Sequence, residues 1–214
     1  MNLTQKVTSS ALSLAIVGSM FTPAMVNASD WYVGGAFGYS KTNVPKQDIN
    51  QSLNQAGQSV GVDSLSDSGT STEVFVGYQL SDIFALEVGY LNLGDRDIVL
   101  SGDILDSSSF YDTVEHIYPD TGKGATLGVI ATYPLSDHWY IGGKVALFHW
   151  QQDYDLTVAG SKVGADSAKG TDVLLGAELG YQLTKQFQIN TSISTVSLEN
   201  DNVNNITLGV RYSF

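Results

Sequence analysis

A phrase that occurs three times constrains this chain more than any other feature of its sequence. Each copy runs tyrosine, a variable residue, leucine, a hydroxyl residue, two variable residues and an aromatic: Tyr78–Phe84, Tyr133–Trp139 and Tyr181–Phe187. Alternating apolar and small or polar residues flank each copy, which is typical of a tight hairpin whose mouth lies at a lipid–water boundary. The three hairpins provide six strands, and alternating segments at Trp31–Ser40 and Asn205–Phe214 bring the count to eight. The sequence therefore predicts an all-β fold, an eight-stranded antiparallel transmembrane β-barrel.

The amino terminus has the features of a secretory leader. An apolar block, Ala11–Phe21, follows the early cation Lys6, and Val26 and Ala28 occupy the −3 and −1 positions of a cleavage site. The block is too short for a spanning helix, which needs roughly 20 apolar residues. We expect a signal peptide over residues 1–28 and a mature barrel domain over residues 29–214.

The composition of the chain excludes disulfides and argues against one class of partner. The chain has no cysteine, so the ladder of backbone hydrogen bonds must hold the fold without disulfides. Loss of the leader, whose one charged side chain is Lys6, takes the formal charge from −12 to −13. Nucleic acid is not expected as a partner, because binding phosphates requires clustered Lys and Arg.

The parity of the strands separates two faces. One parity is continuously apolar, with aromatics at the strand ends, and the other holds the mid-strand charges and most of the strand glycines. This division is expected if the apolar parity faces hydrocarbon. The seventh strand is the weak member, because Thr191 and Thr195 fall on its apolar parity. The predicted lumen charges are Glu73, Glu87, Lys144, Glu178 and Arg211.

The connections alternate in length, as they do in barrels with short periplasmic turns and long external loops. The segment Asp97–Leu105 alternates weakly, so it fits a strand extension above the membrane and a flexible loop about equally well. The four longer connections are roughly Lys41–Thr70, Gly94–Gly122, Gln151–Gly170 and Leu198–Asn204.

Several segments together resemble the transmembrane domain of OmpA-type outer membrane proteins. They are Phe84–Gly94, the turn Tyr133–Asp137, Lys144–Trp150 and the ending Leu208–Phe214. The resemblance covers nearly all of the mature chain, and the order and spacing of the segments make it specific. It implies the outer membrane of a Gram-negative bacterium, with outer membrane lipid and lipopolysaccharide around the barrel.

The resemblance also implies a role for Phe214, since the terminal aromatic of that family belongs to the signal read by the barrel assembly machinery. The resemblance is to the transmembrane domain alone, so the periplasmic peptidoglycan-binding domain of full-length members is not expected here. The chain departs from the family inside the lumen. Glu87 and Lys144 fall where the family has an acid and a base, but Ile130 and Asn190 replace two further bases.

Two interpretations of the lumen charges remain open. Counted from the short-turn side, Glu87 lies level with Arg211, and Lys144 lies level with Glu178, so each pair is predicted to meet. An eight-stranded barrel is just wide enough for its side chains to fill it. The charges then either form a salt-bridged core that plugs the barrel or line a gated ion path.

An enzyme active site, a cofactor and a metal centre are not expected. The histidines are His116 in a long loop, His138 in a short turn and His149 at the outer end of strand five, where it is an interfacial filler rather than a catalytic base. The second long connection is acidic, but it lacks the ordered alternation of a calcium site. Its charged residues are Asp95, Asp97, Asp103, Asp106, Asp112, Glu115 and Asp120, against Arg96 and Lys123.

The leading hypothesis is a non-enzymatic, monomeric outer membrane barrel with a structural or surface-interaction role through its long acidic external loops. The alternatives are a narrow low-conductance pore for ions or small solutes and, third, a lipid-modifying enzyme that uses His149.

Overall fold

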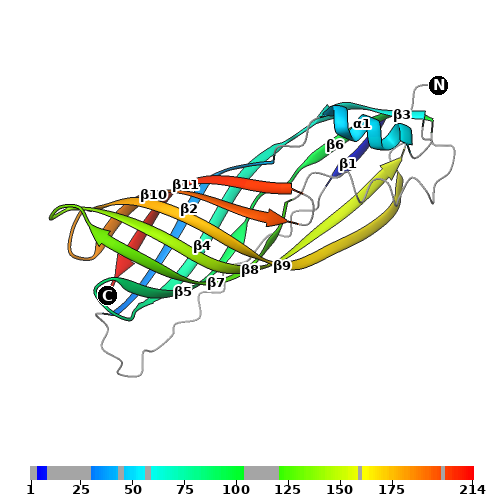
Figure 1. Ribbon diagram of the computed structural model, residues 1–214. Helices are drawn as coiled ribbons and strands as arrows, with labels where there is room; N and C mark the ends of the chain where they lie inside the picture. The colour runs from blue at the N-terminus through cyan, green and yellow to red at the C-terminus, as the bar shows by residue number, and fades with distance from the viewer. Residues whose placement is uncertain are drawn as a thin grey trace.

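All eight predicted strands are present, and they close into a barrel (Figure 1). The computed structural model describes residues 4–8, 30–42, 46–55, 59–103, 121–158, 161–198 and 201–214. The barrel strands are β2 (Trp31–Thr42), β4 (Ser68–Gln79), β5 (Phe84–Asn92), β7 (Lys123–Pro134), β8 (Trp139–Val158), β9 (Ser161–Gln182), β10 (Phe187–Leu198) and β11 (Asp201–Ser213). The other elements are β1 (Thr4–Thr8), α1 (Lys46–Gln55), β3 (Ser59–Leu65) and β6 (Asp97–Asp103).

The barrel strands follow one another around the wall in the order β8, β7, β5, β4, β2, β11, β10, β9. Every neighbouring pair is antiparallel, and pairing of β8 with β9 closes the ring. The two chain-distant strands β2 and β11 pair over eleven registered positions, from Thr42 with Val203 to Tyr32 with Ser213. Closure leaves no barrel edge with unpaired amides, which a hydrocarbon environment requires.

The three repeated phrases form three turns with the same hydrogen bonds. In the first, the Leu80 N–H donates to the Phe84 carbonyl over 2.8 Å, and the Ser81 hydroxyl accepts from the Phe84 N–H over 3.1 Å. Ser136 and Thr184 accept in the same way from Trp139 and Phe187, over 3.2 and 3.0 Å. The repeat therefore needs a hydroxyl residue after the leucine, because that oxygen satisfies the first N–H of the returning strand.

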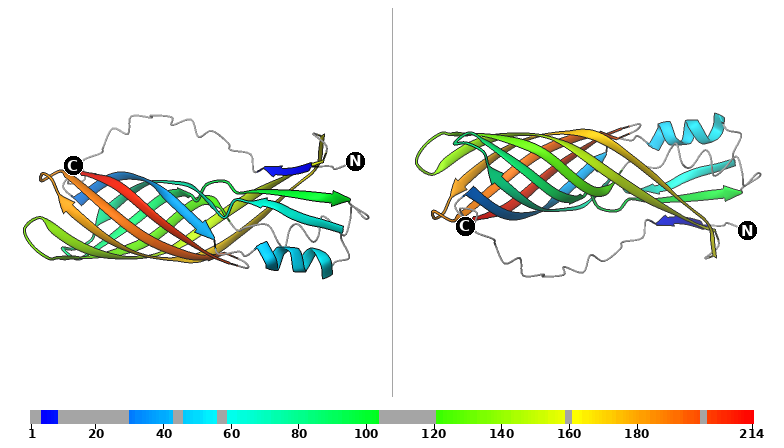
Figure 2. Two further views of the ribbon diagram at one scale, coloured as in Figure 1. Left: turned by 90° about the horizontal axis from the view of Figure 1, so that it is seen from above. Right: turned by 90° about the horizontal axis from the view of Figure 1, so that it is seen from below.

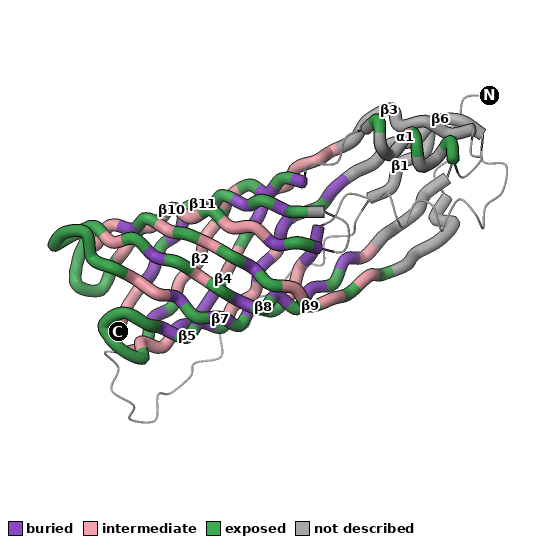
Figure 3. The backbone as a smooth tube through the Cα atoms, in the orientation of Figure 1, coloured by how far each residue is buried: buried purple, intermediate pink, exposed green. Residues whose placement is uncertain are grey.

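The division of faces predicted from strand parity is confirmed. The large apolar side chains on one parity are exposed on the outside of the barrel, for example Val88 at 54% and Ile193 at 61%. The opposite parity is buried in the lumen, so buried and exposed residues alternate along each strand (Figure 3). An apolar outer face and a polar-charged interior match a barrel whose outer solvent is lipid.

Aromatic rings gather at the short-turn mouth. Trp31 packs on Tyr78 with ring centroids 5.0 Å apart, and Trp139 packs edge-on against Tyr181 at 4.9 Å. Both pairs join neighbouring strands on the outer face, where the sequence predicts an interfacial girdle. The carboxyl terminus lies at this same mouth (Figure 2).

The opposite mouth carries more regular structure than expected. The predicted loop 151–170 is instead a continuation of β8 and β9, which pair with each other up to Val158 and Ser161. The connection at 198–204 is likewise shorter than predicted, because β10 and β11 pair up to Leu198 and Asp201. The reason is that two adjacent antiparallel strands can continue their ladder beyond the barrel without any third strand.

The first two long connections also form secondary structure at this end. Of the two interpretations of the segment after Asp97, the strand is the one observed, as β6. It pairs with β3, and α1 lies next to β3 beyond the barrel mouth (Figure 1).

The predicted leader includes β1, which pairs with β6 and with two residues of β8. The barrel itself does not depend on it, because all eight barrel strands begin after residue 28. The predicted cleavage site after Ala28 lies outside the described residues. Within the part of the chain that is described, no helix combines the length and apolar character needed to cross a bilayer.

Candidate functional site in the barrel lumen

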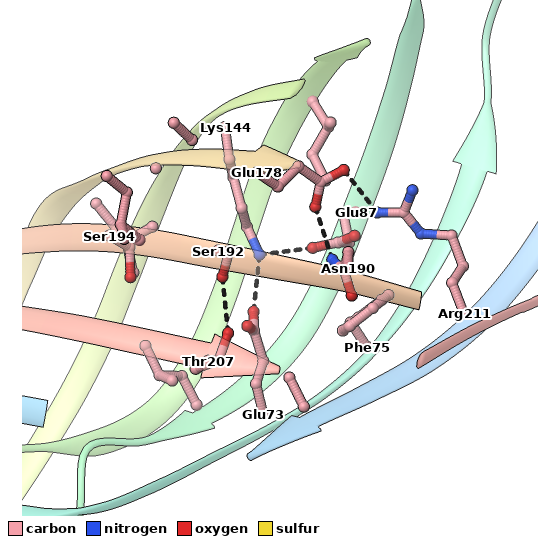
Figure 4. A pocket seen from close by; sticks show the side chains of 17 residues that line it. Glu73, Phe75, Glu87, Lys144, Glu178, Asn190, Ser192, Ser194, Thr207 and Arg211 are labelled. Carbon is pink, nitrogen blue, oxygen red and sulfur yellow. Dashed lines mark hydrogen bonds and ion pairs between the residues drawn. The ribbon is translucent and has the colours of Figure 1, made fainter. Parts of the chain in front are cut away.

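Lys144 connects two carboxylates near the middle of the lumen. Its Nζ lies 2.7 Å from Oε1 of Glu73 and 2.6 Å from Oε1 of Glu87, so one ammonium from β8 bridges β4 and β5 (Figure 4). The Glu87 side chain is 2% exposed. An ion removed from water to this extent is stable only when it is paired and hydrogen-bonded, and Lys144 supplies both.

Arg211 is the centre of a second cluster. Its Nη2 lies 3.3 Å from Oε1 of Glu178, and its Nη1 donates to the Tyr140 hydroxyl over 3.3 Å. The guanidinium also lies over the ring of Tyr32, with Cζ 4.6 Å from the ring centroid. The planar cation is therefore held by a carboxylate at its end and an aromatic ring on its face.

Two neutral side chains complete these clusters. The Asn190 amide donates to Oε2 of Glu178 over 2.9 Å, and the Tyr32 hydroxyl donates to Oε2 of Glu87 over 3.3 Å. Tyr32 touches Arg211 through its ring and Glu87 through its hydroxyl, so it connects the two clusters. Asn190 occupies a site where the OmpA-type resemblance implies a base, and it still provides a hydrogen bond to the lumen acid.

All five predicted lumen charges point inward, but the predicted partners were wrong. Lys144 pairs with Glu87 rather than Glu178, and Arg211 pairs with Glu178 rather than Glu87. The strand register shows that neither predicted pair is level. Glu178 is registered with Gly142 rather than with Lys144. Arg211 is registered through Gly34 and Phe75 with Gly89, two residues from Glu87. Strand tilt and stagger shift levels counted from the turns, and counting residues neglects that shift.

Glycines on the inward parity make room for the rings that surround the charges. Tyr32 is registered directly opposite Gly77, and a Cβ added at Gly77 would lie 1.9 Å from the Tyr32 ring. Tyr140 lies over Gly180 in the same way, with 2.1 Å to an added Cβ. Each ring therefore lies flat on the barrel wall, which fills the lumen without pushing the strands apart.

The external half of the lumen contains an apolar cluster that the sequence analysis missed, beside buried polar side chains such as Ser40 and Ser71. The side chains of the cluster come from five strands and from Leu93, just after β5, and are at most 3% exposed, with Trp150 and Phe148 the largest. We call this set the apolar plug: Leu91, Leu93, Ala146, Phe148, Trp150, Leu174, Val196, Leu198 and Val203. The signal was present in the sequence, as large apolar residues on the inward parity of the longer strands, but only near the external end.

Trp150 is fixed in the plug by one polar contact. Its Nε1 donates to Oδ2 of Asp172 over 2.6 Å, and its ring lies 2.8 Å from where a Cβ at Gly170 would stand. Asp172 therefore gives the buried indole N–H the partner that it needs.

Between the charge clusters and the plug lies a small cavity of about 40 Å³, lined by Glu73, Glu87, Lys144, Glu178 and Arg211 among others. A water molecule needs roughly 10–15 Å³ of such space, so the cavity has room for a few waters.

Phe214 lies at the short-turn mouth and is 55% exposed. Its N–H donates to the Trp31 carbonyl over 3.1 Å, and its ring packs edge-on against Tyr212 at 5.3 Å. The last residue is thus paired to β2 while its ring faces the membrane side. Its predicted role in assembly stays a prediction.

Two of the three histidines lie in the described residues. His149 is exposed on the outer face, and its Nδ1 lies 2.8 Å from the Thr171 hydroxyl. His138 is in a short turn and stacks on Tyr181 at 5.6 Å. His116 lies outside the described residues. No group of three His, Cys, Asp or Glu that would hold a metal ion occurs in the described part of the chain.

The acidic second connection is described only in part. Asp106, Asp112, Glu115 and Asp120 lie outside the described residues. At its beginning, Arg96 is fully buried, and its guanidinium donates to the Ser40 hydroxyl over 2.7 Å. At its end, Lys123 is paired with Asp153 over 3.0 Å. Both cations of this connection, Arg96 and Lys123, therefore have polar partners at the barrel rim.

Comparisons with known proteins found one matching family and several similar proteins. The profile of the outer membrane protein beta-barrel domain matches residues 10–214. An uncharacterized protein of Haemophilus influenzae is 27% identical over 210 residues, which cover 94% of this chain and 98% of that protein. The N-terminal β-barrel domain of Pseudomonas aeruginosa OprF has a TM-score of 0.50 and 15% identity, over 87% of this chain and 98% of that one. Ail, the attachment invasion locus protein of Yersinia pestis, has a TM-score of 0.47 and 14% identity, over 86% of this chain and 99% of that one.

Proposed function

This chain belongs to the outer membrane protein β-barrel domain family, and within that family we propose that it is a closed, non-enzymatic barrel with a structural or surface-interaction role. The protein is thus a bacterial outer membrane β-barrel of the OmpA-like type. The proposal concerns what such a barrel does there. Its partners would contact the external end, where β8 and β9 extend beyond the barrel and the long connections gather.

The observation that carries the proposal is the filled lumen. Ions crossing the barrel would have to pass the Lys144 and Arg211 clusters and then the apolar plug, whose side chains are at most 3% exposed. An apolar constriction opposes hydrated ions because they would lose their water there. The small polar cavity between the two layers supports water binding more than conduction.

Conductance of the protein refolded into planar lipid bilayers tests this proposal. We expect a silent membrane at applied potentials of either sign. Reproducible discrete openings would favour the alternative, a narrow pore, and would contradict the proposal. A variant with the plug residues Phe148 and Trp150 changed to serine is the matched comparison, since it retains the charge clusters.

The surface role is tested by deleting residues 104–120 and joining the ends with a short glycine–serine linker. The barrel strands lie outside this segment, so the variant should still fold and reach the outer membrane. We expect cells with the variant to lose the interaction or protection that the wild-type protein provides. Unchanged behaviour of the cells would place the contact region elsewhere.

The enzyme alternative rests on His149. Among the described residues its imidazole is partnered by the Thr171 hydroxyl, which orients the ring without providing an acid. We expect no lipid product from the wild-type protein beyond that from the His149→Ala variant. A product made only by the wild-type protein would overturn the non-enzymatic assignment.

A further inference from the structure

The outer face of the barrel has a groove across four strands near the external mouth. It is lined by residues of β9, β10, β11 and β2, most of them facing outward, and its volume is about 590 Å³. The groove exists because two of its positions are small: Ala177 and Thr195 lie between the larger Leu175 and Ile193. Its walls are exposed apolar side chains, with Ile193 at 61% and Ile206 at 54%.

Two rows of side chains cross the strands in this groove. The row nearer the short turns is apolar, because Ala177 is registered with Ile193, Ile193 with Ile206, and Ile206 with Tyr39. The next row, one step toward the external end, is polar apart from Leu175, which is registered with Thr195. There Thr195 is registered with Asn204, and Asn204 with Lys41.

The change from an apolar row to a polar row is expected where the hydrocarbon layer of a lipid-facing surface gives way to the headgroups. Thr191, the other threonine on the outer face of β10, hides its hydroxyl by donating to the Thr207 carbonyl over 3.1 Å. Thr195 instead lies in the groove beside Asn204. The groove therefore offers apolar contact on one side and hydrogen-bonding groups with a cation on the other.

Lys41 supplies the cation. Its side chain is 54% exposed, and Nζ lies 3.4 Å from Oδ2 of Asp67, which is also well exposed. An ammonium has three donors, so one carboxylate contact leaves it able to bind a phosphate as well. A lysine at a membrane surface is attracted to the negative charge of anionic lipid headgroups.

We propose that this groove binds one molecule of lipopolysaccharide, with an acyl chain along the apolar row and a lipid A phosphate at Lys41, Asn204 and Thr195. The groove lies at the end with the long connections, which is the external end of such barrels. The lipid of that leaflet is lipopolysaccharide, and this fixes the source of the phosphate. The proposal rests on the external placement used in the proposed function, but it does not require a silent lumen.

The test uses the full-length protein, processed and extracted from outer membranes, with purified lipid A as the probe. Native mass spectrometry counts bound lipid A during a titration, and phosphatidylglycerol is titrated in parallel. The groove-filling variant is Ala177→Leu, and the matched control is Ala125→Leu, an exposed outward alanine on β7 away from the groove. Both changes add an apolar side chain to the lipid-facing surface, so both proteins should fold.

We expect the wild-type protein and Ala125→Leu to retain one lipid A, and Ala177→Leu to bind it about tenfold more weakly or not at all. Lys41→Gln should weaken binding about fivefold, whereas Lys185→Gln in a short turn should not change it. Equal lipid A binding by all variants would overturn the proposal. Equal binding of phosphatidylglycerol at the same groove would overturn the assignment to lipopolysaccharide.

A third outcome would also overturn it. If the wild-type protein formed a dimer without bound lipid and Ala177→Leu were a monomer, the groove would be an interface between two copies. Bilayer conductance of each variant is recorded in the same preparations. A failure of lipid binding with a silent lumen then leaves the proposed function standing, and the two hypotheses are separated.

Discussion

The Nζ atom of Lys144 lies 2.6 Å from Oε1 of Glu87, and this pair joins β8 to β5, which lie on either side of β7 in the barrel wall. Glu87 is 2% exposed, and Lys144 is 15% exposed while also binding Glu73. The lumen thus has one cation placed between two acids. Removal of that cation would leave two uncompensated carboxylates in a confined, poorly hydrated space.

We therefore predict that Lys144→Met lowers the free energy of unfolding by roughly 3–5 kcal/mol. This free energy is measured by urea titration of the protein in lipid vesicles, with tryptophan fluorescence as the signal. The triple variant Lys144→Met, Glu73→Gln, Glu87→Gln should recover most of the loss, because no unpaired charge remains. If the single and triple variants were equally unstable, lost packing rather than charge would be the cause.

Arg211→Ala is expected to destabilise the barrel by a similar amount, since Glu178 loses its ion pair. The free energy of unfolding of Arg211→Lys should fall between those of the wild-type protein and Arg211→Ala. It keeps the charge but loses the planar group that lies over the Tyr32 ring and donates to Tyr140. Equal stability of the lysine variant and the wild-type protein would show that the ring contacts contribute nothing.

Gly77→Ala is predicted to cost roughly 1–3 kcal/mol, because its new methyl group would overlap the Tyr32 ring. The matched control is Gly143→Ala on the outer face, where the nearest atom to an added Cβ is 4.0 Å away. Replacing Tyr32 with leucine in the Gly77→Ala background should recover part of the loss. A control that is as unstable as Gly77→Ala would mean that strand conformation, rather than the ring, determines the result.

The three tryptophans test the apolar plug directly. Trp31 and Trp139 are 38% and 46% exposed on the outer face, whereas Trp150 is 2% exposed inside the lumen. In variants that keep one tryptophan and replace the others with phenylalanine, brominated phospholipids should quench Trp139 strongly and Trp150 weakly. Strong quenching of Trp150 by the lipid would place it outside the lumen and remove the plug.

The secondary structure was predictable because a membrane barrel repeats one local rule. Strand parity assigns each side chain to lipid or lumen, and the hydroxyl residues at Ser81, Ser136 and Thr184 determine the three short turns. The lumen contacts were less predictable. Which acid meets Lys144 depends on the stagger of strands that are far apart in the sequence, and on the reach of long side chains across the lumen.

The amino-acid sequence alone determined the barrel strands, their two faces and the inward direction of the five charged residues, since each follows from a period of two along a strand. Tertiary structure alone decided three things: which charges pair, that Trp150 and its neighbours cluster in the external half of the lumen, and that small outward residues on adjacent strands leave a groove. These features depend on the register between strands and on the closure of the sheet. A single segment of sequence determines neither the register nor the closure, because each strand pair adds its own stagger and the sum over all pairs decides how the first strand meets the last.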